Sequence, residues 1–224
     1  MQSSDTIRLG VIGTGSVVRE IYQYLYFRSE FSPMIHVVSA CDTDPKSLSW
    51  FCDKFDIPAN ARYTDYSQMI AEGDFDAVAI NTPDTLHTDP AVAALNNGID
   101  VLLPKPTAST VKDAHEIIKT AKKSGRYIAV DFHKRDDPIV KEASARYQNG
   151  DYGQLQTAVM YMLDRLEVAD PNHVPRFFAS PDFAHRNTPV SFLTSHMADT
   201  FMMITGLKPR KVRAIGYKRK LPYL

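Results

Sequence analysis

The sequence lacks the features that mark secreted, disulfide-rich or membrane-spanning proteins. It contains only two cysteines, Cys41 and Cys52, and they form neither a CxxC pair nor a cysteine–histidine cluster with metal-ligand spacing. No window approaches the ~18 uninterrupted apolar residues of a membrane-spanning helix, and residues 1–10 lack the basic start and apolar core of a secretory signal. We therefore expect a cytoplasmic globular protein with two buried free thiols and no structural metal.

Neither sign of charge is in excess. Lys and Arg together number 26, and so do Asp and Glu, which makes the formal net charge zero. We therefore expect neither nucleic acid nor a membrane surface as a partner. Hydrophobic residues make up 44% of the 224 residues, enough to bury one good core and a second small one.

Near its start the chain combines a strand, a glycine turn and a helix. Residues 7–12 are an apolar run of strand type, Gly13 and Gly15 follow, and apolar residues then recur at spacings of three and four. Such a turn offers backbone amides to the pyrophosphate of a dinucleotide, with Gly13 permitting the turn and Gly15 the close approach. An ordinary glycine turn is the alternative, because Val18 replaces the third glycine of the GxGxxG fingerprint. The candidate cofactor contacts here are Gly13, Thr14, Gly15, Ser16 and Val17.

An acidic residue follows the next predicted strand, residues 34–41. Asp42 is placed to accept hydrogen bonds from both hydroxyls of an adenosine ribose, whereas Asp44 has a separate role available as helix N-cap before Pro45. A carboxylate at this position repels the 2′-phosphate of NADP, and the nearest following cation is Lys46. We therefore expect NAD as the cofactor in preference to NADP.

Strand and helix patterns alternate through the first part of the chain. Further strands are predicted at residues 61–63, 77–81, 100–103 and 127–132, and helices at 45–55, 67–71, 89–97 and 110–123. This alternation is typical of a doubly wound α/β fold with a parallel sheet. We assign residues 1–135 to a dinucleotide-binding domain.

The pattern changes after a turn near residue 150. A helix is predicted at 138–148, and residues 155–163 and 211–217 alternate as half-buried strands around an irregular segment and a helix at 191–205. We assign residues 136–224 to the start of an α+β domain with an open, largely antiparallel sheet. Two strands and one helix rarely form an independent core, so we expect this domain to be incomplete and to expose apolar surface.

A lysine flanked by prolines follows one of the predicted strands. Lys105 lies between Pro104 and Pro106, which hold their neighbours in extended geometry. Ligands bind at the carboxyl ends of strands in such sheets, and partial burial there would lower the pKa of the lysine. We interpret Lys105 as a candidate proton-transfer group, with a stiff surface turn as the alternative.

Three histidines are further candidates. His87 and His133 each come just after the carboxyl end of a predicted strand, where polar ligand contacts are expected. His196 lies on the predicted 191–205 helix beside an apolar stripe, so a structural histidine is the alternative to a catalytic one.

Together these motifs resemble the Gfo/Idh/MocA family of oxidoreductases. The resemblance extends over essentially the whole chain and rests on GVIGTGSV, CDTDP, INTPDTLHTDPAVAALNNGIDVLLPKP and SHMADTFMMITG, of which the third block is the most specific. It implies a nicotinamide-binding Rossmann domain followed by an α+β domain whose open sheet shelters the substrate and often packs in homo-oligomers.

The resemblance also implies roles for individual residues. Asp42 would bind the adenosine ribose, and Lys105 and His196 would correspond to the lysine of the EKP motif and the active-site histidine. The residues expected to line the cofactor cleft are Thr82, Pro83, His87, Lys105 and His133.

Three departures from the family pattern leave the chemistry open. Pro104 replaces the EKP glutamate, Phe192 stands where an aspartate precedes the histidine, and Asp84 stands where asparagine is usual. The first hypothesis is that the protein is an NAD-dependent dehydrogenase acting on a secondary hydroxyl of a sugar, polyol or sugar-derived acid. The second is an enzyme that uses NAD for transient oxidation before elimination or hydrolysis. The third is an NAD-binding protein without turnover that serves as a sensor or assembly partner.

Overall fold

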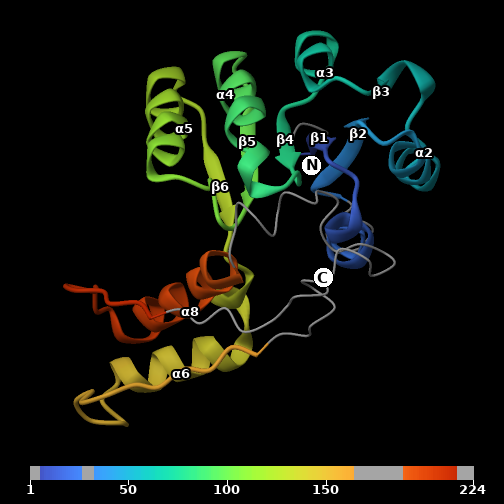
Figure 1. The fold of residues 1–224 in the computed structure, drawn as a ribbon. Coiled ribbons are helices and arrows are strands. Elements are labelled where there is room, and N and C mark those ends of the chain that lie inside the picture. Colours follow the sequence, from blue (N-terminus) through green and yellow to red (C-terminus); the bar gives the residue numbers. More distant parts are fainter. Residues whose placement is uncertain (1–5, 27–32, 164–188, 216–224) are drawn as a thin grey trace, which may run out of the picture. The chain divides into compact units, whose positions relative to one another are not determined.

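The computed structural model describes residues 6–26, 33–163 and 189–215 (Figure 1). Contacts divide the chain into two compact units, Met1–Asp131 and Phe132–Leu224. The first unit holds the sheet, and the second holds α6 (Pro138–Gln148) and α8 (Pro189–Thr205).

The first unit contains a parallel sheet of six strands in the order β3-β2-β1-β4-β5-β6. All neighbouring pairs run parallel. The strands are β1 (Ile7–Ile12), β2 (Ile35–Cys41), β3 (Arg62–Tyr63), β4 (Ala77–Ile80), β5 (Asp100–Pro104) and β6 (Ile128–Asp131). The strand order reverses between β1 and β4, as in doubly wound dinucleotide-binding sheets. The predicted α/β fold with a parallel sheet is therefore confirmed.

Helical segments connect the consecutive strands of the first unit. The Asp44 carboxylate accepts hydrogen bonds from the backbone N–H groups of Lys46 and Ser47, which confirms its predicted role as an N-cap. The Thr110 hydroxyl accepts from the N–H of Asp113 in the same way. The helical segments are η1 (Val18–Tyr22), α1 (Gln23–Tyr26), α2 (Pro45–Lys54), η2 (Ala59–Ala61), α3 (Tyr66–Glu72), η3 (Asp84–Leu86), α4 (Thr88–Asn96) and α5 (Val111–Ser124).

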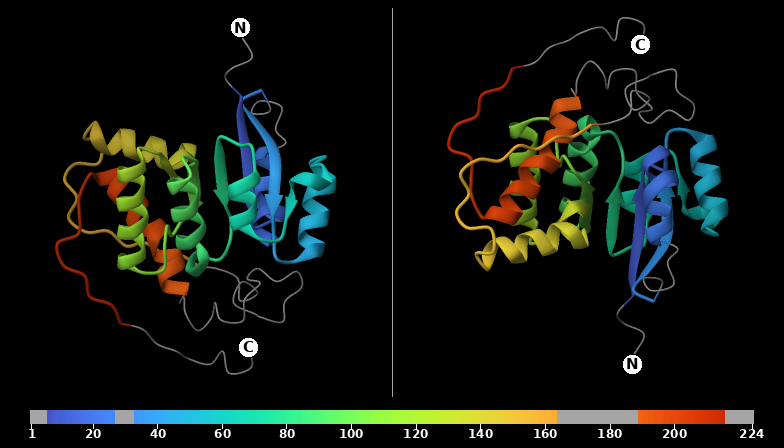
Figure 2. Two further views of the ribbon diagram at one scale, coloured as in Figure 1. Left: turned by 90° about the horizontal axis from the view of Figure 1, so that it is seen from above. Right: turned by 90° about the horizontal axis from the view of Figure 1, so that it is seen from below.

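Alternate residues of the central strands pack on opposite faces of the sheet. Ile12 and Val78 belong to one buried cluster, together with residues of α3, α4 and α5. Val11 and Ala79 belong to the other, together with Val18 and residues of α2. Figure 2 shows α4 and α5 side by side, at the end of the sheet away from α2. Burial on both faces explains why these strands read as continuous apolar runs in the sequence.

The helical segment after the glycine turn differs from the predicted apolar pattern. It begins at Val18 as a π-helical turn and continues as α1 from Gln23. Val18 and Tyr22 are buried, but Ile21, which the spacing placed on the same apolar face, is 55% exposed. A π-helical turn contains more residues than an α-helical turn, so the α-helical spacing rule does not select one face there.

In the second unit, η4 (His133–Asp136), α6 and α8 form the regular structure of the described residues. Helices α6 and α8 lie side by side (Figure 1). The hydroxyl of Ser144 on α6 donates a hydrogen bond to the backbone carbonyl of Met203 on α8, at 3.1 Å. The helices predicted at 138–148 and 191–205 are confirmed.

The two strands predicted for this unit are wrong over the described residues. Neither residues 155–163 nor residues 211–215 are paired in a sheet, and the rest of the second prediction lies outside the described residues. Tyr161 and Leu163 are 85% and 92% exposed, so the alternating pattern does not bury one face here. A strand exists only through hydrogen bonds to a neighbouring strand, and these segments have none among the described residues. The predicted antiparallel sheet stays a prediction.

Both cysteines lie in the core of the first unit as free thiols, as predicted. Burial raises the pKa of the Cys41 thiol to about 12 and that of the Cys52 thiol to about 11, so neither is a reactive thiolate near neutral pH. Among the described residues, no helix is long and apolar enough to cross a membrane. The same part of the chain has no cluster of three or more metal-binding side chains.

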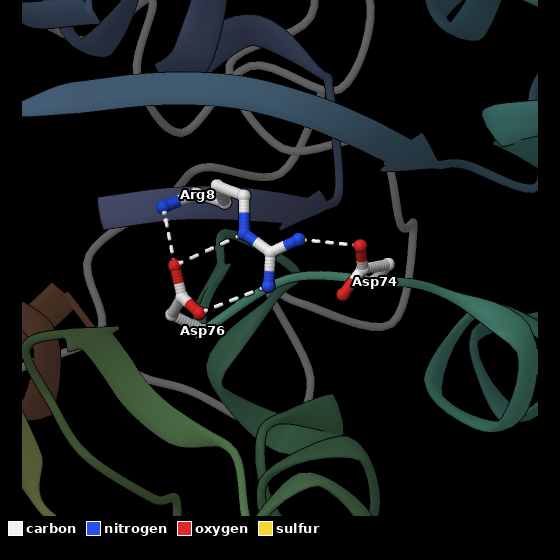
Figure 3. A network of polar contacts seen from close by, with 3 residues as sticks. All are labelled: Arg8, Asp74 and Asp76. Carbon is white, nitrogen blue, oxygen red and sulfur yellow. Dashed lines mark hydrogen bonds and ion pairs between the residues drawn. The ribbon is translucent and has the colours of Figure 1, made fainter. Parts of the chain in front are cut away.

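An ion-pair cluster aligns β1 with β4 near their amino-terminal ends (Figure 3). Asp76, just before β4, accepts from the backbone N–H of Arg8 at 2.8 Å and from its guanidinium at 3.1 Å, while its own N–H donates to the carbonyl of Arg8 at 2.9 Å. The guanidinium also donates to Asp74. These bonds to Arg8 hold the pKa of Asp76 below its usual range.

We expect Asp76→Ala to lower the urea unfolding midpoint at pH 7, because the backbone N–H and guanidinium of Arg8 both lose an acceptor. A lowered carboxyl pKa stabilises the fold above the unfolded-state pKa of about 4, and this contribution is lost as the pH falls through the folded-state value. The difference from wild type should therefore shrink below pH 3. Asp74→Ala is the matched control, because Asp74 contacts only the guanidinium. An equal decrease of the urea unfolding midpoint in both variants would contradict the proposed role of Asp76 in aligning β1 with β4.

Candidate functional site

Three loops follow β1, β4 and β5 at the carboxyl edge of the sheet. They contain residues 13–17, 81–87 and 105–107, which include most of the candidate residues. The three strands are neighbours in the parallel sheet, so their loops meet at one edge (Figure 1). This edge, at the point where the strand order reverses, is where doubly wound sheets bind ligands.

Gly13 packs directly against the backbone that follows β4. Its φ is +86°, and a Cβ built on it would lie 2.8 Å from the carbonyl carbon of Asn81 and 2.9 Å from the nitrogen of Thr82. No side chain is compatible with that position without displacing backbone. The N–H of Gly13 donates to the carbonyl of Cys41 at 2.8 Å, which ties the turn to β2 as well.

Gly15 has the opposite environment. A Cβ built on it would meet nothing within 4 Å, so the protein itself does not require glycine there. The bare backbone leaves open space beside the turn, as expected where the phosphates of a dinucleotide approach closely. In the described part of the chain, the buried Nδ2 of Asn81 has no hydrogen-bond partner, so it is an unsatisfied donor next to the turn. Asn81 ends the predicted 77–81 strand and is not among the residues predicted to bind a ligand.

Asp42 is held beside the glycine turn by hydrogen bonds to the main chain and to Thr14. Its Oδ2 accepts from both the N–H and the hydroxyl of Thr14, at 2.7 and 2.9 Å, and its Oδ1 accepts from the N–H of Asp44 at 2.9 Å. Thr14 is fully buried, whereas Asp42 is partly exposed. The carboxylate is therefore fixed in position with an exposed side, as a ribose-binding group requires. Ser16 and Val17 are partly exposed on the same turn.

Arg19 is a cation near this corner that sequence reasoning missed. Its guanidinium lies 3.5 Å from the hydroxyl of Ser47 in the first turn of α2 and stacks on Trp50, 4.5 Å from the ring centroid. The predicted cofactor preference takes into account only cations that follow Asp42 in the chain. Arg19 reaches Ser47 because η1 packs on the same face of the sheet as α2, which no local pattern of the sequence indicates.

His87 is buried between two loops. It is 1% exposed, its Nε2 lies 2.9 Å from the carbonyl oxygen of Thr82, and its Nδ1 lies 3.2 Å from that of Thr107. Burial lowers the pKa of His87, and the two carbonyl contacts oppose this effect. Thr82 and Pro83 are partly exposed on the same loop, whereas Asp84 is buried. That these residues contact a cofactor stays a prediction.

Lys105 follows the last residue of β5 and is 7% exposed. The alternative of an exposed surface turn is therefore wrong for the lysine side chain itself. A buried lysine amine at the ligand edge of a sheet is a candidate for proton transfer.

His196 and His133 meet within the second unit. His196, on α8, is 7% exposed, and its ring centroid lies 4.7 Å from that of His133 on η4, with the planes at 65°. Asp199, one helical turn later, is 4% exposed and accepts a bidentate pair of hydrogen bonds from Arg135. The side chain of Phe192 lies outside the described residues. Lys105 belongs to the first unit, so its cooperation with His196 stays a prediction.

Asp199 lies on the same helix as His196, and the sequence predictions do not include its partner Arg135. The guanidinium Nε and Nη2 lie 2.9 and 2.6 Å from the two carboxylate oxygens. The available signal was the basic run that follows β6, which ends in Arg135. This ion pair and the histidine contact together attach η4 to α8.

Comparisons with known proteins agree with this geometry. The profile of the Gfo/Idh/MocA oxidoreductases, described as an oxidoreductase family with an NAD-binding Rossmann fold, matches residues 7–132. The 1-carboxy-3-chloro-3,4-dihydroxycyclohexa-1,5-diene dehydrogenase of Comamonas testosteroni is 31% identical over 67% of this chain and 36% of its own length. The D-glucoside 3-dehydrogenase of Escherichia coli K12 is 27% identical over 74% of this chain and 46% of its own.

A solved structure is similar as well. The crystal structure of myo-inositol 2-dehydrogenase from Lactobacillus plantarum has a TM-score of 0.61 and 25% identity, and it covers 66% of this chain and 43% of that one. The chain thus spans less than half the length of each of these relatives.

We expect Arg135→Met to lower the stability of the second unit by about 1–3 kcal/mol, because it leaves the buried Asp199 carboxylate without its charged donor. Hydrogen exchange of the α8 amides should rise with it. Arg146→Met is the matched control, since among the described residues its ion pairs are with the exposed carboxylates of Glu142 and Asp151, and it also lies over the ring of Tyr152. Equal effects of the two substitutions on α8 exchange would argue against this anchoring role.

Proposed function

Because the chain belongs to the Gfo/Idh/MocA family of NAD(P)-binding oxidoreductases, we propose that it is an NAD-dependent dehydrogenase acting on a secondary hydroxyl of a sugar, polyol or sugar-derived acid. The observation that carries the proposal is the open glycine turn at Gly15 beside the fixed carboxylate of Asp42. The names of the similar proteins include a dihydroxycyclohexadiene, a glucoside and an inositol, all ring compounds with hydroxyl groups.

In this proposal each part of the edge has a separate task. The amides of residues 13–17 and the donor of Asn81 bind the phosphates, and Asp42 binds the adenosine ribose. Bound NAD supplies the acceptor for the hydride that leaves the carbinol carbon. Lys105 takes the hydroxyl proton on its unprotonated Nζ as the carbonyl product forms, assisted by His196. Residues 136–224 would contribute to the substrate pocket and to contacts between copies of the chain.

Two alternatives share the same cofactor site. An enzyme that oxidises its substrate transiently before elimination or hydrolysis would not accumulate reduced NAD. A sensor or assembly protein without turnover would bind NAD and remain inert with every substrate. Because Pro104 replaces the EKP glutamate, the sensor hypothesis is tested alongside the dehydrogenase hypothesis.

We expect tighter binding of NAD than of NADP, because the Asp42 carboxylate would face the 2′-phosphate. Titration calorimetry with both dinucleotides measures this directly. Asp42→Asn should weaken NAD binding and narrow the difference between the two, whereas Asp53→Asn, an exposed carboxylate on α2, should change neither. Tighter binding of NADP by the wild type would overturn the assignment of Asp42.

Lys105→Met should leave the affinity for NAD within about twofold and reduce turnover by about a hundredfold or more, since general acid–base assistance contributes about 10²–10⁴. The measurements are calorimetry with NAD and the rate of NADH formation with myo-inositol and methyl glucoside. Lys119→Met, on the exposed side of α5, is the control. Wild-type turnover in Lys105→Met would end this mechanism, and an inert wild type that binds NAD would favour the sensor.

A further inference from the structure

His87 occupies a position that a direct cofactor contact does not explain. Its ring is 1% exposed, so almost none of its surface is available to a ligand. Both ring nitrogens instead face main-chain oxygens, that of Thr82 after β4 and that of Thr107 after β5. The ring therefore bridges the loops that follow two neighbouring strands. Its contact with Thr107 joins residues that are 20 positions apart in the sequence.

The bridged segment is the one that carries Lys105. Thr107 lies two residues beyond the lysine, and the carbonyl of Pro106 also contributes to the environment of the ring. Pro104 and Pro106 have no N–H group, so the backbone on either side of Lys105 offers few donors with which to anchor itself. Pro104 is paired with Asp131 of β6, which holds the start of the segment, and the carbonyl of Thr107 after Lys105 can accept a hydrogen bond from a neighbouring loop. The Nδ1 of His87 lies 3.2 Å from that carbonyl oxygen.

The contacts of the ring with the two carbonyl oxygens depend on which ring nitrogens carry hydrogen. Two carbonyl oxygens only accept, and a neutral imidazole donates from one nitrogen, whereas an imidazolium donates from both. His87 is also the N-cap residue of α4, because its backbone carbonyl accepts a hydrogen bond from the N–H of Ala91 at 3.1 Å. The bridge is thus built on a helix start and a strand end, which are the rigid parts of this edge.

We propose that His87 is a positioning residue that holds the Pro104–Thr107 segment in place and thereby fixes Lys105 for proton transfer. This inference rests on the proposed role of Lys105 and replaces a direct contact between His87 and the cofactor. It predicts that loss of the bridge makes Lys105 less fixed in position and lowers kcat, while the affinity for NAD stays nearly unchanged. A misplacement of about 1 Å at a reacting group costs on the order of a hundredfold in rate.

The test compares His87→Phe, which keeps a ring but removes both ring nitrogens, with His87→Gln, which keeps a donor. The full chain is labelled by reductive methylation, and the labelling rate of Lys105 is measured by peptide mass spectrometry relative to exposed Lys119. We expect labelling of Lys105 to rise severalfold in His87→Phe and less in His87→Gln. His115→Phe, an exposed histidine on α5, should leave it unchanged. This readout needs no substrate.

Calorimetry and kinetics complete the test. His87→Phe should keep its NAD affinity within about twofold and lose about tenfold to a hundredfold in kcat, with partial recovery in His87→Gln. Unchanged labelling of Lys105, or a large loss of NAD affinity with unchanged labelling, would overturn the inference. If Lys105→Met retains turnover, the proposed mechanism fails, but altered labelling of Lys105 still reports the bridge. If His87→Phe does not fold, the His87→Gln labelling decides.

Discussion

The candidate site depends on the contact between the Gly13 turn and the backbone after β4. Gly13 has a positive φ and lies so close to Asn81 and Thr82 that a Cβ would overlap with backbone atoms. Backbone cannot yield as a side-chain end can, so this contact sets the distance between the glycine turn and the β4 loop. Asp42 is then positioned from the same turn, through the two hydrogen bonds from Thr14. A change at Gly13 would therefore move the glycine turn relative to the β4 loop and, through Thr14, would move Asp42.

Buried polar groups connect the loops at this edge of the sheet to one another. His87 joins the loops after β4 and β5 through main-chain oxygens. In the second unit, Arg135 and Asp199 join η4 to α8 in a comparable way. A buried polar group without a partner costs about 1–3 kcal/mol, so such bonds persist and hold irregular segments in defined positions. His87 and Arg135 thus hold loop segments in fixed positions, as the hydrogen bonds between strands do in the sheet.

The second unit shows what happens to a strand pattern without a partner. Residues 155–163 alternate as a half-buried strand does, yet within the described part of the chain they pair with no other strand, and Leu163 is 92% exposed. A helix satisfies its own backbone, and α6 and α8 therefore form as predicted and pack on each other. A strand depends on hydrogen bonds to a neighbouring strand, so its sequence pattern alone does not form it.

The sequence by itself determined the parallel α/β sheet, the cap at Asp44, and the Gly13 to Asp42 segment as a candidate dinucleotide site. These features depend on local periodicity, on turn chemistry and on single residue types, all of which can be read along the chain. Only the tertiary structure decided that Arg19 reaches Ser47, that Arg135 pairs with Asp199, and that His87 faces Thr107. These contacts join residues that are far apart in the sequence, and no local pattern encodes which side chains the packing of the sheet and helices brings together.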